Sequence, residues 1–387
     1  MMDFEYWWLL ALPLFFSLGW LAARVDIKQL MSESTALPAA YFKGLNFLIS
    51  DQHDKAIEAF VEAVEANADS LELHFALGSL FRRRGEVDRA IHLHLNLLSR
   101  KELPDPQKLA VTAELAQDYL KAGLLDRAEE LFRALDDSRY QQPALRALLE
   151  IYVREREWER AIAAATELER LSGVPFRKEI AQYYCEMAIR STLANETDTA
   201  RQQLQLALNA NQICVRANVM LGDIEAAAGG HEAAISIWKR IEFQQAEFLG
   251  FISAKILASY RALNRTTEGL KLLKTYLQTY KMASLLGVVY ETTMSEQGAE
   301  DAAKLARDEL AKRPSLQTLD QLLQARAMLD NSEQDNHIMQ LAVRNAIGNR
   351  SAYFCDQCGF RARHYHWQCP ACNSWESFPP EPREPLV

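Results

Sequence analysis

The sequence has little glycine and proline and contains no common enzyme signature. Only 15 glycines and 12 prolines occur in 387 residues, which favours helices over an all-β fold with many tight turns. There is no glycine-rich phosphate loop, no G-x-S-x-G and no H-E-x-x-H, so the usual motifs of nucleotide binding, serine hydrolysis and zinc proteolysis are missing. We therefore expect a protein without enzymatic activity.

Long blocks of basic residues are also missing. The formal net charge is -9 and the isoelectric point is about 5.5. Nucleic acids carry dense negative charge and select basic surfaces. We therefore expect no nucleic acid among the partners of this chain.

Two copies of one pattern open a repeating region. Gly44 and Ala56 of the first copy recur as Gly78 and Ala90, 34 residues later, each glycine being followed by an aromatic residue three positions on. This period and spacing are those of the tetratricopeptide repeat (TPR), a pair of antiparallel helices. The small residues are expected where the two helices approach most closely. One such unit cannot bury its apolar face alone and needs stacked neighbours.

Five further copies follow with weaker matches. The second-helix small residues of all seven copies are Ala56, Ala90, Ala128, Ala161, Ala200, Ala234 and Gly269, at intervals of 34, 38, 33, 39, 34 and 35 residues. Arg156 is predicted to take the turn position that glycine usually holds, and a longer turn is predicted at 194–199. Two helical pairs with poor matches complete a predicted TPR array over residues 37–348, since terminal repeats are often atypical.

Residues 1–24 are predicted to form a transmembrane anchor, followed by a linker over 25–36. Tyr6 to Ala23 is a stretch of 18 residues without a charge, roughly 27 Å as a helix against a hydrocarbon core of about 30 Å. A cleaved signal peptide would need basic residues before this stretch, where only acidic ones occur; a buried core helix is the other alternative. Arg24 and Lys28 follow it, so the positive-inside rule places the bulk of the chain in the cytoplasm.

The C-terminal part contains four of the six cysteines. They form two C-x-x-C knuckles with ten residues between them: Cys355, Cys358, Cys369 and Cys372. Such knuckles place four thiolates at the corners of a tetrahedron and leave no open position for catalysis. The spacing predicts one structural metal ion, zinc or iron, in a module over 349–378, with a redox dithiol as the alternative. The proline-rich residues 379–387 are predicted to be a disordered tail.

Several single residues carry weaker signals. Gly359 and Asn373 follow the second and fourth cysteines of the knuckles, where a positive φ is expected. Cys185 and Cys214 are isolated in the sequence and are interpreted as small apolar residues. His94 takes the core position that phenylalanine holds in the first copy, which predicts a buried or half-buried histidine.

A partner is expected on the first helices of the repeats, because solenoids bind on the concave surface that their curvature creates. Projecting the 34-residue frame onto the second to fourth copies places seven polar residues there: Arg82, Arg83, Gln117, Lys121, Arg146, Glu150 and Arg154. A positive groove on an acidic protein would attract an acidic partner surface. The alternative is an ordinary solvated helix face.

The whole chain resembles the bacterial lipopolysaccharide assembly protein B family. The parts that carry the resemblance are EYWWLLALPLFFSLGWLAARVD, HFALGSLFRRRGEVDRAI and YFCDQCGF…WQCPACNSW, in this order. The resemblance implies an all-α TPR helical-hairpin solenoid after one transmembrane helix, with a small rubredoxin-like metal module at the C-terminus. The four knuckle cysteines take the metal-ligand positions of the family.

The resemblance also implies a function. Such proteins are adaptors of the bacterial inner membrane that hold down lipopolysaccharide synthesis. They promote destruction of the lipid A deacetylase LpxC by the membrane AAA protease FtsH. These two proteins, other lipopolysaccharide assembly proteins of the inner membrane, and the lipid of that membrane are the partners expected from the resemblance.

One departure bears on the alternative function, a redox protein with an iron centre at the four cysteines on a TPR scaffold. A typical rubredoxin has glycine after the second knuckle and a much longer insert between the knuckles. Here Asn373 follows the second knuckle and the insert is ten residues. No flavin, haem or second cluster motif accompanies the knuckles, which disfavours electron transfer.

Overall fold

The computed structural model describes residues 39–101, 103–136, 138–329, 333–347 and 353–381, together with Phe16 and Trp20. Apart from those two positions, the predicted anchor and linker (1–24 and 25–36) lie outside the described residues, as does most of the predicted tail. None of the helices in the described ranges is both long and apolar enough to cross a membrane.

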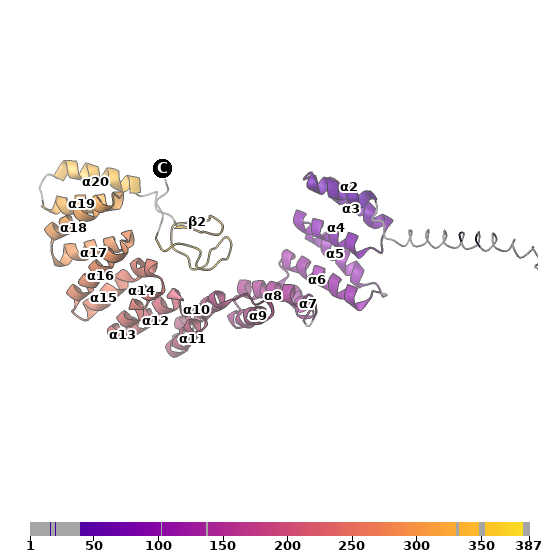
Figure 1. Ribbon diagram of the computed structural model, residues 1–387, viewed down its shortest axis with the longest axis horizontal. Coiled ribbons are helices and arrows are strands. Elements are labelled where there is room, and N and C mark those ends of the chain that lie inside the picture. Colours follow the sequence, from indigo (N-terminus) through magenta and orange to yellow (C-terminus); the bar gives the residue numbers. More distant parts are fainter. Residues whose placement is uncertain are drawn as a thin grey trace, which may run out of the picture. The chain divides into compact units, whose positions relative to one another are not determined.

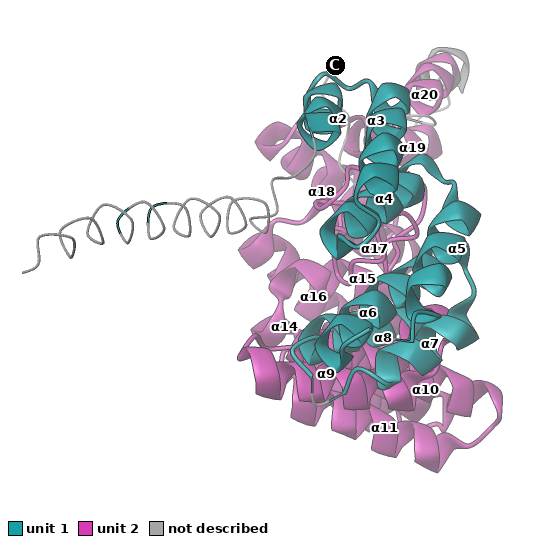
Figure 2. Ribbon diagram, turned by 90° about the vertical axis from the view of Figure 1, so that its right-hand side faces the viewer, with its two compact units in different colours: residues 1–151 teal, residues 152–387 magenta. Residues whose placement is uncertain are grey.

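The chain divides into two compact units, coloured separately in Figure 2. Unit 1 ends at Ile151 and unit 2 begins at Tyr152, so the boundary falls near the end of one helix. The helices up to this boundary are α2 (Ala39–Ile49), α3 (His53–Ala66), α4 (Leu71–Arg84), α5 (Val87–Leu98), α6 (Asp105–Ala122), α7 (Leu125–Arg133) and α8 (Gln141–Glu155), whose last turn belongs to unit 2.

Unit 2 continues the series of helices and ends in a small module with two short strands (Figure 1). Its helices are α9 (Trp158–Ser172), α10 (Arg177–Leu193), α11 (Thr197–Ala210), α12 (Val215–Ala227), α13 (His231–Lys239), α14 (Ile241–Gln244), η2 (Ala246–Phe248), α15 (Leu249–Ala262), α16 (Thr266–Tyr280), α17 (Ala283–Glu296), α18 (Ala299–Lys312), α19 (Leu316–Leu329) and α20 (Glu333–Ile347). The strands β1 (Tyr353–Phe354) and β2 (Arg361–Ala362) pair antiparallel. The predicted helical TPR solenoid with a C-terminal four-cysteine module is confirmed.

The repeated small residues lie where the helices of a hairpin meet. The seven second-helix positions are all buried: Ala56, Ala90, Ala128, Ala161, Ala200, Ala234 and Gly269. On the first helices, a methyl group added to Gly44 would lie 2.6 Å from the ring of Phe60, and one added to Gly222 would lie 2.1 Å from Nε1 of Trp238. The glycines are therefore required because a large second-helix side chain packs directly on their backbone.

In every hairpin whose turn the structure describes, the turn contains a residue with positive φ. These residues are Asp51, Gly85, Gly123, Arg156, Asn195, Gly229, Asn264 and Gly298. Arg156 has a φ of 58°, so it does take the turn position that glycine holds in other hairpins. Glycine and asparagine predominate because other side chains clash with the backbone in this conformation.

The predicted longer turn at 194–199 is wrong. Helix α10 ends at Leu193 and α11 begins at Thr197, which leaves three residues, as many as separate α12 from α13. The extra length lies in α10 itself, which has 17 residues where α12 has 13. The spacing of the small residues showed that this copy is longer, but it could not show whether a helix or a turn contains the additional residues.

The apolar core follows the hairpins within each unit. In unit 1, Ile57, Phe60, Leu77 and Phe81 pack between the first two hairpins. In unit 2, one cluster extends from α12 through α17, and it includes partly buried Tyr365 and Trp367 from the C-terminal module. The module is therefore packed on the helices of unit 2.

Candidate metal centre and its docking face

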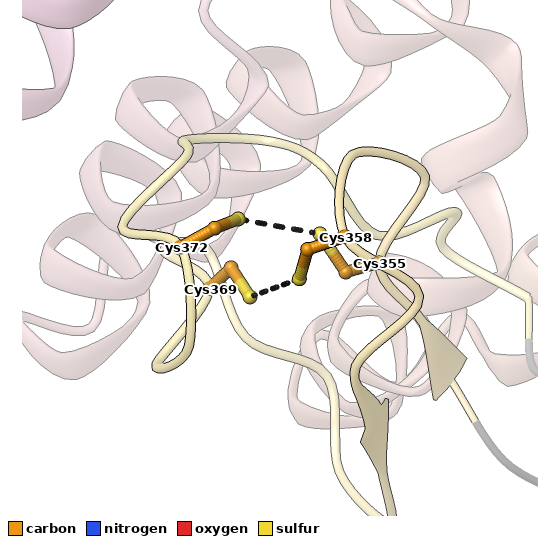
Figure 3. Close-up of side chains that lie close together, drawn as sticks. All are labelled: Cys355, Cys358, Cys369 and Cys372. Carbon is orange, nitrogen blue, oxygen red and sulfur yellow. Dashed lines mark hydrogen bonds between the residues drawn. The ribbon is translucent and has the colours of Figure 1, made fainter. Parts of the chain in front are cut away.

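The four predicted cysteines come together at one end of the C-terminal module (Figure 3). The Sγ atoms of Cys355 and Cys372 are 3.7 Å apart, and so are those of Cys358 and Cys369. All four sulfur atoms lie within 4.8 Å of one another. Cys355 and Cys369 are buried, whereas Cys358 and Cys372 are exposed.

The backbone of the two knuckles explains this convergence. Gly359 has a φ of 74° and Asn373 a φ of 58°, as their positions after the cysteines predict. These conformations let the N–H of Gly359 donate to the carbonyl of Cys355 at 2.8 Å, and the N–H of Asn373 to that of Cys369 at 2.9 Å. Each knuckle is thus a closed turn with both thiols on one side.

The thiols differ in how readily they ionise. Burial opposes ionisation of Cys355, but the hydroxyl of Ser377 and the backbone N–H groups of Cys358 and Gln357 lower its pKa to about 6. The Ser374 hydroxyl and N–H likewise lower the pKa of Cys372. The backbone at Phe360 favours ionisation of Cys358, but burial and the neighbouring thiols raise its pKa to about 12. Four thiolates cannot coexist here without a cation, because each opposes the charge of the next.

The donor set fits a tetrahedral metal ion. At a metal–sulfur bond of about 2.3 Å, neighbouring sulfurs of a regular tetrahedron lie about 3.8 Å apart, close to the 3.7 Å of the two described pairs. Cys355, Cys358, Cys369 and Cys372 would hold the ion, and four protein ligands leave no position for a substrate. The geometry supports one structural ion and accommodates zinc or iron, as predicted from the knuckles.

Aromatic rings attach the module to η2 and α10 of unit 2. Trp367 is stacked on Phe248, with ring centroids 5.5 Å apart and planes 4° apart. Tyr365 lies edge-on to the same Phe248 at 6.0 Å, and Trp375 lies edge-on to Tyr183 of α10 at 6.2 Å. Each such ring pair contributes about 0.5–1.5 kcal/mol beyond the area that it buries.

Charged and polar groups complete this contact. The amide of Gln182 donates to Glu376 of the module at 2.6 Å, and Nζ of Lys178 lies 3.4 Å from the same carboxylate. The guanidinium of Arg216 in α12 lies 5.8 Å from the ring of Trp367 and 5.6 Å from that of Trp375. We call the surface that the module contacts the docking face of unit 2; it comprises Lys178, Gln182, Tyr183, Arg216, Phe248, Phe251 and Ser284.

The start of the predicted tail is also held. The carboxylate of Glu381 accepts hydrogen bonds from the N–H of Ser284 at 3.1 Å and from its hydroxyl at 2.7 Å. Ser284 lies in the first turn of α17, where backbone N–H groups have no partner within the helix. A carboxylate at this place caps the helix, so Glu381 adds a contact beyond the metal knuckles.

Docking of the module was not predicted from the sequence. The available signal was three aromatic residues, Tyr365, Trp367 and Trp375, in a module too small to bury them internally. The surface that these rings contact could not be predicted from the knuckles, because the contacting positions lie between 97 and 198 residues away along the chain.

The predicted partner-binding residues occupy different environments. Arg83, Lys121, Arg146, Glu150 and Arg154 are exposed, and Gln117 is half-buried. Arg82 is half-buried, and its guanidinium donates to Asp118 at 2.7 Å and to Glu114 at 2.6 Å; partner binding at these seven positions stays a prediction. Arg82 thus joins two hairpins. Arg154 lies beyond the boundary of unit 1.

His94 belongs to the same polar network and is fully buried, as its core position predicts. Its Nδ1 lies 2.5 Å from Asp118, and a methyl group on Gly78 would lie 2.5 Å from its Cε1. Asp118 is also fully buried. It therefore accepts hydrogen bonds from an arginine and a histidine of the preceding hairpin, which satisfies its charge.

Cys185 and Cys214 are buried, as expected of small apolar residues, but these two cysteines, isolated in the sequence, are neighbours in the structure. Their Sγ atoms are 4.0 Å apart. Cys185 lies in α10 and Cys214 directly precedes α12, so adjacent hairpins bring the two thiols together. The 34-residue frame could have indicated this, since both residues precede or occupy first helices of consecutive copies.

Together, the hairpins and the knuckles define a TPR scaffold protein with a tetrahedral four-cysteine site. Residues 43–100 match the family described as tetratricopeptide repeat, and residues 353–380 match the one described as rubredoxin metal binding domain. The chain is 31% identical over 378 residues to lipopolysaccharide assembly protein B of Escherichia coli strain K12, a match that covers 96% of this chain and 97% of the relative. The chain belongs to the lipopolysaccharide assembly protein B family.

A second relative of the same name and one solved structure are also similar to this chain. Lipopolysaccharide assembly protein B of Haemophilus influenzae is 29% identical over 386 residues, covering 96% of this chain and 97% of the relative. Among solved structures, that of Naa15/Naa10 bound to HypK-THB is 14% identical, with 80% of this chain and 53% of that chain covered. Its TM-score of 0.36 marks a likeness too slight to bear on the fold.

Proposed function

We propose that this protein is a membrane-anchored adaptor, without enzymatic activity, that regulates lipopolysaccharide synthesis. In this proposal it sits in the bacterial inner membrane through residues 1–24, with its bulk in the cytoplasm. It brings the deacetylase LpxC to the protease FtsH and so hastens destruction of the deacetylase. Other lipopolysaccharide assembly proteins and the membrane lipid are further partners in this proposal.

The observation that carries the proposal is the match along 96% of the chain to relatives named lipopolysaccharide assembly protein B. A match of this extent covers nearly the whole chain and not one module alone. Scaffold architecture supports the adaptor role, because stacked hairpins offer an extended surface to a partner. The four cysteines support a structural metal, since they close the coordination shell.

In this proposal the adaptor needs its membrane anchor to hasten turnover of the deacetylase. A protease and its substrate adaptor that share one membrane meet at a raised effective concentration without any new contact. Deleting Met1–Ala23 should leave a folded protein that binds the deacetylase but does not hasten its turnover at native expression. The measurement is the half-life of the deacetylase in cells that carry only the truncated form. A half-life equal to that with the full-length protein would show that the anchor is dispensable.

The partner surface in this proposal is the first-helix face of unit 1. Arg83 lies on α4, Lys121 on α6 and Arg146 on α8, and all three are exposed. Arg82 is left out because its charge is neutralised by Asp118 and Glu114. Three exposed positive charges on an acidic chain would steer an acidic partner surface, and the attraction would weaken with salt.

Charge reversal tests this surface. The triple variant Arg83→Glu, Lys121→Glu, Arg146→Glu should bind purified deacetylase or protease at least tenfold more weakly at low salt, with a smaller difference at high salt. Exposed charges contribute little to stability, so helicity should not change. The matched control is Lys101→Glu, an exposed lysine in the turn after α5. Equal binding of both partners by triple variant, control and wild type would reject this face.

The redox alternative is not favoured. The relatives along the whole chain are named for lipopolysaccharide assembly, and all four cysteines are used in one closed shell. An Fe–S4 centre absorbs visible light and zinc does not. The colour of the purified protein and its metal content therefore separate a coloured iron centre from a structural zinc ion.

A further inference from the structure

A second pair of thiols lies inside unit 2, apart from the metal knuckles. Sγ of Cys185 and Sγ of Cys214 are 4.0 Å apart, and both residues are fully buried. They belong to different hairpins, so a bond between them would join α10 covalently to the start of α12. A hydrophobic core needs no such pairing, because either position could be filled by alanine or serine.

The surroundings make the two thiols chemically unequal. Cys214 immediately precedes α12, and a helix N-terminus stabilises a thiolate. The hydrogen bond from Cys185 lowers the pKa of Cys214 against the effect of burial, and the N–H of Ala217 lowers it further. The charges of Glu376 and Arg216 act in opposite directions: Glu376 raises this pKa and Arg216 lowers it. The hydrogen bond with Cys214 and burial raise the pKa of Cys185 well above its ordinary value. Cys214 is thus the nucleophile of the pair, and Cys185 retains its proton.

A single side chain, that of Gln182, separates Cys214 from the docked module. Nε2 of Gln182 is 3.6 Å from Sγ of Cys214 and 2.6 Å from the carboxylate of Glu376 in the module. The side-chain oxygen of Gln182 accepts a hydrogen bond from Arg216 at 3.1 Å. The guanidinium of Arg216 lies within 5.8 Å of the rings of both module tryptophans. Gln182 is itself fully buried. The cover over the thiols is therefore held in place by residues of the metal-binding module.

We propose that Cys185 and Cys214 are a redox-reactive dithiol, which a hydroperoxide converts to a disulfide when the metal-binding module leaves the docking face. The Cys214 thiolate attacks the peroxide, so that an S–O bond forms, the O–O bond breaks and hydroxide or an alkoxide leaves, which takes a proton from solvent water. The sulfur of Cys185 then attacks the sulfenic acid, so that the S–S bond forms and the S–O bond breaks. The departing hydroxide takes the Cys185 proton and leaves as water. The two sulfurs lose two electrons, which the peroxide gains.

The required movement is small. A disulfide has sulfurs about 2.05 Å apart, so the present separation of 4.0 Å must close by about 2 Å. Rotation of the two side chains about their Cα–Cβ bonds can share this shift. The inference is independent of the adaptor function, because it concerns only thiol chemistry within unit 2.

Peptide mapping of the full-length, metal-loaded protein tests the proposal. The chain is treated with hydrogen peroxide, free thiols are alkylated, and tryptic peptides 179–190 and 202–216 are sought as a disulfide-linked pair. Each peptide contains one cysteine. Trp375→Ala and Trp367→Ala loosen docking without touching a knuckle cysteine. Arg363→Ala, an exposed change in the same module, is the matched control, and Cys214→Ser must abolish the linked pair.

We expect the disulfide to form at least tenfold faster in both tryptophan variants than in wild type and Arg363→Ala. Circular dichroism accompanies each sample. A variant that loses helicity is replaced by wild-type protein treated with a chelator, which releases the module without a substitution. Absence of the linked pair under every condition would overturn the dithiol. Equal rates of disulfide formation in docked and undocked protein would overturn the claim that docking of the module protects the two thiols.

Discussion

The first helices of the two units complete their polar contacts in different ways. In unit 1, Arg82 of α4 is neutralised by Asp118 and Glu114 of the next first helix. In unit 2, Arg216 of α12 pairs with Glu186 of α10 in a similar way, but it also lies between two tryptophans of the module. One repeat pattern therefore produces two kinds of surface.

The difference lies in what covers each face. In unit 2 the docking face is closed by a segment that folds around the four cysteines. In unit 1 the described residues, apart from Phe16 and Trp20, all belong to hairpins and their connections. The docking face of unit 2 is completed within the chain, whereas the first-helix face of unit 1 is the one proposed to bind a partner. Four changes test this contrast, in order of expected size.

Loss of the metal should have the largest effect, and only in unit 2. Cys355→Ser removes one of four ligands, and structural zinc supplies about 10–16 kcal/mol of folding energy in small metal-binding peptides. The variant should therefore lose bound metal and unfold the module. The helices should persist, because solenoid contacts are between nearest neighbours. Metal content by mass spectrometry and circular dichroism measure both effects. Wild-type metal content in this variant would reject the four-cysteine site.

Removal of the arginine that neutralises Asp118 should destabilise unit 1. Arg82→Ala leaves a fully buried carboxylate without its main cationic partner, which costs about 3 kcal/mol or more. Hydrogen–deuterium exchange should rise in α4, α5 and α6 and stay unchanged in the module. Arg83→Ala is the matched control, since Arg83 is next to Arg82 in the same helix and is exposed. Equal exchange in both variants would show that Arg82 is not structural.

Hairpin packing in unit 2 can be separated from docking by changing a glycine. Gly222→Ala places a methyl group 2.1 Å from the buried Trp238 ring, and overpacking of this kind costs about 1–3 kcal/mol. Gly287→Ala is the control, because its nearest neighbour would be 4.0 Å away. The control should be neutral or slightly stabilising, since alanine favours helix. Denaturant melts of the two variants give the comparison, and equal midpoints would contradict the packing argument.

The smallest effect concerns the pH dependence of docking. Burial raises the pKa of Glu376 above its ordinary 4.5, against the opposing effects of Lys178 and Gln182. The docked carboxyl keeps its proton at pH values where the free carboxyl has lost it. Docking is therefore strongest below pH 4.5 and weakens as pH rises through the raised pKa.

The variant Glu376→Gln isolates the contribution of Glu376 to the pH dependence of docking, because it removes the titrating carboxyl group but leaves the thiols unchanged. The melting temperature of the module, followed by tryptophan fluorescence, should fall in wild type relative to Glu376→Gln as pH rises from about 4.5. A difference between the two proteins that stays constant with pH would show that Glu376 does not titrate in this contact.

Much of the fold followed from period and residue size. The recurring small residues, 33 to 39 residues apart, identified the hairpins. A large side chain cannot fit where the two helices of a hairpin meet, as Gly44 against Phe60 illustrates. The position of the extra residues near α10 could not be predicted, since adding a turn of helix and lengthening a loop change the interval alike. The anchor stays a prediction, because residues 1–24 lie outside the described ranges apart from Phe16 and Trp20.

The site was predictable where its geometry is local and not where it is long-range. The knuckles are short turns, so spacing alone brought Cys355, Cys358, Cys369 and Cys372 together. Arg82 appeared to be a surface charge because its partners, Glu114 and Asp118, lie on a helix more than 30 residues away. The contact of Trp367 with Phe248 likewise depends on how the chain returns to unit 2, which no local pattern encodes.

Hydrogen–deuterium exchange of the full-length protein, before and after removal of its metal by a chelator, tests the contrast between the units most directly. Without metal the module should leave the docking face, and backbone amides in α10, α12 and α15 should exchange faster. Those in α4 and α6 should exchange as before, because the described contacts of the module are with the docking face of unit 2. Unchanged exchange in α10, α12 and α15, or an equal rise in α4 and α6, would contradict this account.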